Sequence, residues 1–127
     1  MMPSEMMDDL VTWLRAQLDE DERVARAVPG SGCWSKYIEA GDGAAIETDP
    51  GGDPGAIIGD EPMAEHMARH DPVRVLAEVA AKRRILDEVV GGLAREERWA
   101  RRFAEHLARL LALPCADQPG YREEWRP

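Results

Sequence analysis

Asp71 and Pro72 separate two helical segments of the sequence. A proline pushes the residue before it out of helical backbone space, so the segment that starts at Pro62 must end near His70. Aspartate is a favoured helix N-cap, and proline is well tolerated at the first helical position. We therefore expect a short helix before Asp71 and a longer helix that begins at Pro72.

The longer helix carries apolar residues at nearly heptad spacing, interrupted by Arg83: Leu76, Val79, Leu86, Val90 and Leu93. A seam of this kind packs against another helix. We expect an antiparallel partner helix, from the same chain or from another one. Gly91 and Gly92 are poor helix formers, and we expect them to bend or break the helix.

An amphipathic helix is expected over residues 7–28. Its leucines recur every four positions, at Leu10, Leu14 and Leu18, and Pro29-Gly30 ends it. The acidic block at 19–22 falls on successive positions and therefore wraps around the helix. We expect this block to be solvated.

Residues 30–61 lose the helical period and gain glycine and proline. Two short strands, 33–39 and 44–48, are expected on either side of a turn at 40–43, with a loop at 49–55 and a third short piece at 56–58. A lone hairpin is marginal in water. We therefore expect this one to pack on a helix.

The last long helix is expected from about Ala94 to Leu113, with its large apolar side chains facing one way: Trp99, Phe103, Leu107 and Leu110. The tail at 114–127 carries Tyr121 and Trp125 four residues apart, so one helical turn would present both rings together. These rings either dock on the body of the protein, which we favour, or serve as aromatic anchors for a partner.

These segments predict a mainly α fold. It is a small helical domain of three long helices and one short helix with a short β-hairpin insertion, and we expect a single domain over residues 1–127. Its parts are a helix at 7–28, the hairpin and loop at 30–61, helices at 62–113 and the tail at 114–127. A chain of this length can bury a modest core without disulfide bonds or bound metal ions to stabilise it.

Charge is unevenly distributed along the chain, whose net charge is −9. Residues 1–70 hold 15 acidic and 5 basic residues, and the remainder holds 10 acidic and 11 basic residues. An acidic surface repels nucleic acid and anionic membranes, so we expect neither as a partner. The sequence has no apolar run long enough to span a bilayer and no secretory leader, which favours a cytoplasmic protein.

Three motifs carry a family resemblance: MDDLVTWLRAQLDEDE, HMARHDPVRVLAEVAAKRRILD and LLALPCADQPGYREEWRP. With them the chain resembles a family of uncharacterised proteins from actinobacteria and their phages that is labelled as a domain of unknown function. The resemblance covers most of the chain. It implies no activity.

His66 and His70 are the candidate metal ligands. They stand at helical i, i+4 spacing, so both imidazoles could meet one Zn²⁺ ion, with Asp71 or His106 as a further ligand. A complete structural site needs four ligands, and neither an HExxH motif nor a CxxC pair is present. The favoured alternative places both histidines near the helix end without a metal or any other cofactor.

The sequence contains no recognisable enzyme motif, and none of its serines lies in a GxSxG elbow. Our leading hypothesis is a non-enzymatic protein-interaction or regulatory module that binds a protein partner through helix faces, with a homodimer as one form of that partnership. One alternative is a phage-type acidic DNA mimic or inhibitor of a host enzyme. Another is a small metal-dependent enzyme built on His66 and His70.

Overall fold

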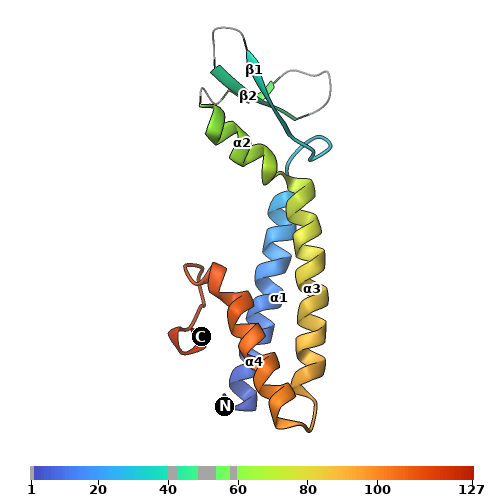
Figure 1. Ribbon diagram of the computed structural model, residues 1–127, viewed down its shortest axis with the longest axis vertical. Helices are drawn as coiled ribbons and strands as arrows, with labels where there is room; N and C mark the ends of the chain where they lie inside the picture. The colour runs from blue at the N-terminus through green and yellow to red at the C-terminus, as the bar shows by residue number, and fades with distance from the viewer. Residues whose placement is uncertain (1, 40–42, 49–53, 58–59) are drawn as a thin grey trace. The chain divides into compact units, whose positions relative to one another are not determined.

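The computed structural model describes residues 2–39, 43–48, 54–57 and 60–127, and it confirms a mainly α fold (Figure 1). The helices are α1 (Ser4–Arg26), α2 (Glu61–Arg69), α3 (Pro72–Leu93) and α4 (Arg98–Ala112), and the strands are β1 (Ser35–Glu39), β2 (Gly43–Glu47) and β3 (Pro54–Ile57). Two short 3₁₀ turns, η1 (Leu113–Cys115) and η2 (Glu123–Trp125), lie in the tail. Contacts group the chain into two compact units, one of residues up to Glu20 with Val79–Pro127 and one of Asp21–Glu78. The single domain stays a prediction.

The core of the first unit lies between α1 and α3, which run antiparallel (Figure 1). Two ion pairs show the antiparallel direction. Arg15 pairs with Asp87 at 3.4 Å, and Asp19, one turn later on α1, pairs with Arg83, one turn earlier on α3, at 2.8 Å. Within the first unit, the buried side chains of these two helices are Met7, Leu10, Leu14, Leu18, Val79, Leu86 and Val89. The predicted partner helix is therefore confirmed and comes from the same chain.

The predicted seam differs from the observed one near the end of α3. Val89 is buried and Val90 is exposed, so the buried stripe is shifted by one residue from the heptad seam. Helix α3 also continues through Gly91 and Gly92 and ends just after them, at Leu93. The helix therefore breaks one residue after the predicted glycine pair, and Gly92 lies inside it where α4 comes close.

The core of the second unit lies between a three-stranded antiparallel sheet and α2. In the sheet β2 is central. Its Ala45 lies opposite Tyr37 of β1, and its Ile46 lies opposite Ala56 of β3. Ala44, Ile46 and Ala64 form the buried cluster, with Trp34 and Met67 packed against it. The hairpin thus packs on a helix as predicted. The turn at 40–42 and the loop at 49–53 lie outside the described residues.

Asp71 performs the capping role that the sequence predicts. Its Oδ1 accepts a hydrogen bond from the backbone N–H of Arg74 at 2.8 Å, and its Oδ2 accepts one from the backbone N–H of Trp34 at 3.0 Å. The first bond satisfies an unpaired N–H at the start of α3, and the second joins that helix to the chain before β1. Asp71 is therefore a buried structural carboxylate.

Candidate functional site

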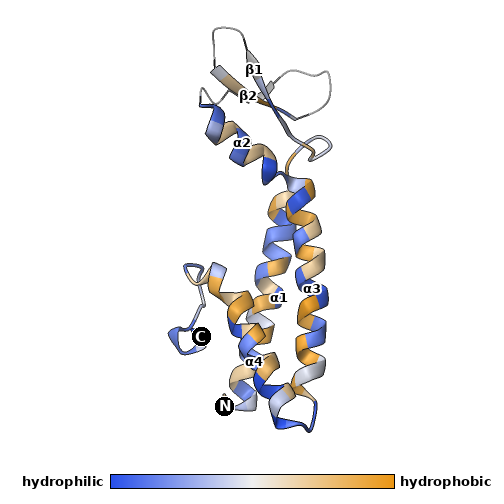
Figure 2. Ribbon diagram, viewed as in Figure 1, coloured by the Kyte–Doolittle hydropathy of each residue, from blue (hydrophilic) through white to orange (hydrophobic). Residues whose placement is uncertain are grey.

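Helix α4 buries its small side chains and exposes its large ones. Alanines repeat every four residues along its buried side: Ala100, Ala104, Ala108 and Ala112. Trp99 is 70% exposed, Phe103 59% and Leu110 43%. Figure 2 shows apolar and charged residues interspersed along this helix. The sequence predicted the shared direction of the large side chains, but this direction is toward solvent, and Leu107 is only half-buried beside them.

Two arginines flank these exposed side chains. Arg98 and Arg102 are one turn apart on α4, so they lie on the same flank of the helix, next to Trp99 and Phe103. Both are exposed, and neither has an ion-pair or hydrogen-bond partner for its guanidinium among the described residues. We call Trp99, Phe103 and Leu110, together with Arg98 and Arg102, the α4 face.

The loop before α4 is locally charge-balanced. The Arg95 guanidinium donates to both carboxylate oxygens of Glu97, at 2.9 and 3.1 Å. This hydrogen-bonded pair, with help from a backbone N–H, lowers the pKa of Glu97 to about 2, and the same pair raises the pKa of Arg95. Because Glu97 is already paired, it leaves the charges of Arg98 and Arg102 available to a partner.

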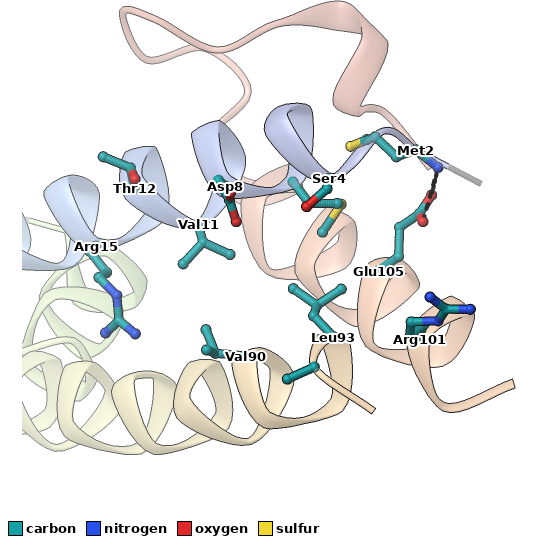
Figure 3. A pocket seen from close by; sticks show the side chains of 12 residues that line it. Met2, Ser4, Asp8, Val11, Thr12, Arg15, Val90, Leu93, Arg101 and Glu105 are labelled. Atoms are coloured by element: carbon teal, nitrogen blue, oxygen red, sulfur yellow. Dashed lines mark hydrogen bonds between the residues drawn. The ribbon is translucent and has the colours of Figure 1, made fainter. Parts of the chain in front are cut away.

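A hollow of about 630 Å³ lies between the start of α1, the end of α3 and α4 (Figure 3). Val11, Val90 and Leu93 give it an apolar lining. Its buried carboxylate, Glu105, accepts hydrogen bonds from the backbone N–H of Met2 at 3.0 and 3.1 Å and from Arg109 Nη2 at 3.2 Å. Glu105 is thus satisfied within the protein, and it ties the N-terminal segment to α4.

The two candidate metal ligands lie side by side at the C-terminal end of α2, where His70 is the C-cap. The rings of His66 and His70 are 4.3 Å apart between centroids, and Nδ1 of His70 is 2.7 Å from the backbone oxygen of His66. Asp71, proposed as a further ligand, accepts hydrogen bonds from the backbone N–H groups of Arg74 and Trp34 instead. No group of three or more His, Cys, Asp or Glu side chains within the described ranges could hold a metal ion. Zinc binding at His66 and His70 stays a prediction.

Tyr121 and Trp125 pack against Trp13 of α1. The Trp13 ring centroid lies 5.6 Å from that of Tyr121 and 5.5 Å from that of Trp125. Trp13 Nε1 donates to the backbone oxygen of Pro119 at 3.0 Å, and Trp125 is only 1% exposed. The structure therefore shows the docked arrangement of the tail. The use of Tyr121 and Trp125 as anchors for a partner stays a prediction.

The other charge clusters pair in part, as expected for mixed helix surfaces. Within the acidic block at 19–22, Asp19 pairs with Arg83 and Glu22 pairs with Arg26. Helical spacing alone cannot tell whether Arg98 and Arg102 are ion-paired or solvated. That neither has a partner among the residues the structure describes is a signal that only three-dimensional contacts provide.

The comparisons with known proteins give a family and no activity. Among the described residues, no helix combines the length and apolar character needed to cross a membrane. No curated protein and no solved structure matches the chain. A family model described as "Family of unknown function (DUF6221)" matches residues 7–127. Because this match covers nearly the whole chain, the protein belongs to that family of unknown function.

Proposed function

We propose that the protein is a non-enzymatic protein-interaction module that binds a protein partner through the α4 face. The observation that carries the proposal is the exposure of Trp99 and Phe103 one turn apart on one helix. Large exposed aromatic side chains are costly in water unless they are used, and a contiguous apolar patch marks an interaction site. Trp and Arg are also the residue types enriched among the side chains that dominate binding energy.

The packing beneath the α4 face supports this role. The alanine side of α4 lies against the rest of its unit, and Gly92 allows a close approach to Ala104. The Glu105 carboxylate accepts hydrogen bonds from the backbone N–H of Met2 at 3.0 and 3.1 Å, which gives the helix a further anchor. The exposed aromatic rings therefore stand on a fixed helix, which lowers the entropy cost of binding a partner.

Co-purification from the organism that encodes the protein tests the proposal. The bait is the full chain, the test variant is Trp99→Ala with Phe103→Ala, and the matched control is Val24→Ala with Met63→Ala, which also removes two exposed apolar side chains. We expect a protein retained in near-stoichiometric amount by the wild type and the control and lost by the test variant. Equal retention by the test variant would contradict the proposal.

A further inference from the structure

The α4 face has a positive charge that none of the described residues neutralises. Although the whole chain carries −9, Arg98 and Arg102 form a local positive flank beside Trp99 and Phe103. Nearby cations such as Arg95 and Arg109 already have carboxylate partners, Glu97 and Glu105 respectively.

From this imbalance we propose that the partner contributes an acidic amphipathic helix to the α4 face. The inference rests on the proposed function and adds the chemistry of the partner. Trp99, Phe103 and Leu110 form a stripe that extends along α4 for about 16 Å at 1.5 Å per residue. A second helix laid along such a stripe can match it with apolar residues at i, i+3 or i+4, and i+7.

The positive flank defines the polar side of that partner helix. Arg98 and Arg102 are one turn apart, so two carboxylates one turn apart on a parallel or antiparallel helix can reach them together. Complementary charge at the rim of an apolar contact fixes the register and raises the association rate. We therefore expect Asp or Glu on the side of the partner helix that faces these arginines.

A second copy of the chain fits the face less well. A twofold contact brings the same patch of both copies together. Each copy would then offer Arg98 and Arg102 again, and the α4 face contains no carboxylate that could pair with them, so their charge would stay unneutralised. Nucleic acid also fits less well, because its affinity comes from many phosphate contacts and the chain as a whole is acidic.

Binding of labelled helical peptides to the full chain, followed by fluorescence anisotropy, tests the inference. One peptide has a leucine stripe flanked by glutamates, a second has glutamines in their place, and a third has lysines. The test variant is Arg98→Glu with Arg102→Glu. The control is Arg69→Glu with Arg84→Glu, which makes the same charge change at two exposed arginines that have no side-chain partner within the described residues.

We expect the glutamate peptide to bind at least about tenfold more tightly than the lysine peptide, because attraction to two arginines is replaced by repulsion. The test variant should lose this preference and the control should keep it. Equal binding of the glutamate and glutamine peptides would overturn the inference that the partner helix is acidic. The proposed function of the α4 face as an apolar protein-binding surface would still stand. Failure of all three peptides to bind would also overturn the inference, and the co-purification experiment would then decide the proposed function separately.

Two further outcomes would replace the inference with another. If the α4 face binds a single-stranded oligonucleotide in an Arg98- and Arg102-dependent manner and does not bind the glutamate peptide, the partner is a nucleic acid. If native mass spectrometry shows a dimer that Trp99→Ala dissociates, the occupant is a second copy.

Discussion

A Cβ atom on Gly92 of α3 would lie 2.9 Å from the Cβ of Ala104 on α4. Real Cβ atoms do not approach this closely, so the contact requires glycine on one helix and a small residue on the other. The alanine side of α4 consequently faces inward at this crossing, and the opposite side of α4, with Trp99 and Phe103, is exposed. The close crossing thus accounts for the exposed aromatic face.

Gly92→Ala should destabilise the protein by about 1–3 kcal/mol, because the added methyl group overpacks the contact with Ala104. Gly91→Ala is the matched control. A Cβ at Gly91 meets nothing within 4 Å, so this change should stabilise the helix by about 0.5–1 kcal/mol. Urea denaturation measures both. Equal stabilisation by the two substitutions would show that the helices are not in close contact.

Trp125→Ala and Trp99→Ala should differ strongly in their effect on stability. Trp125 is buried against Trp13, so its removal should cost about 3–5 kcal/mol. Trp99 is 70% exposed, so its removal should change the free energy of unfolding by less than about 0.5 kcal/mol. Thermal and urea unfolding of both variants provide the measurement. If Trp125→Ala left the free energy of unfolding unchanged, the tail would not dock on the protein and would be free to bind a partner.

The carboxyl group of Glu97 should titrate near pH 2, below its ordinary value of 4.5, because Arg95 hydrogen-bonds to its charged form. Since the folded-state pKa is the lower one, the stabilisation from this pair is present above the unfolded-state pKa and is lost as the pH falls from about 4.5 toward about 2. Carboxyl ¹³C shifts followed against pH report the titration directly. In Arg95→Gln the Glu97 midpoint should move back toward 4.5, and an unchanged midpoint would exclude Arg95 as the cause.

Protein purified without a histidine tag should contain zinc at well below one ion per chain. His66 and His70 supply two imidazoles, Nδ1 of His70 already contacts a backbone oxygen, and a structural zinc site needs four ligands. Native mass spectrometry, compared with the denatured mass, measures the bound metal. One zinc per chain that is lost in His66→Ala would support the metal-dependent enzyme instead.

Sequence reasoning succeeded where the determining chemistry is local. The boundary between α2 and α3 follows from Asp71-Pro72, because proline and a capping carboxylate act on neighbouring residues. The apolar stripe of α3 predicts an antiparallel partner, but the sequence leaves open whether this partner comes from the same chain, and only the structure identifies it as α1. The hairpin follows from turn residues between short strand-forming segments, and its packing on a helix follows from its small size.

Sequence reasoning failed where either of two faces of one helix could have been the buried face. Helix α4 offers an alanine side and a side with larger apolar residues, and helical periodicity assigns each residue to a face without saying which face is inward. The usual preference for burying large side chains indicates the wrong face here. The repeat of alanine every four residues, together with Gly92, is the signal of a close helix crossing that could have identified the buried face.

Site-specific photo-crosslinking tests the central claim most directly. A photoreactive amino acid replaces Trp99 in one variant and the exposed Val24 in another. Each variant is produced in the organism whose genome encodes the protein, and the living cells are irradiated. We predict one discrete adduct with a different protein from position 99, weakened by Phe103→Ala, and no such adduct from position 24. The absence of any discrete adduct at position 99, or the same adduct at both positions, would contradict a protein-binding role for the α4 face.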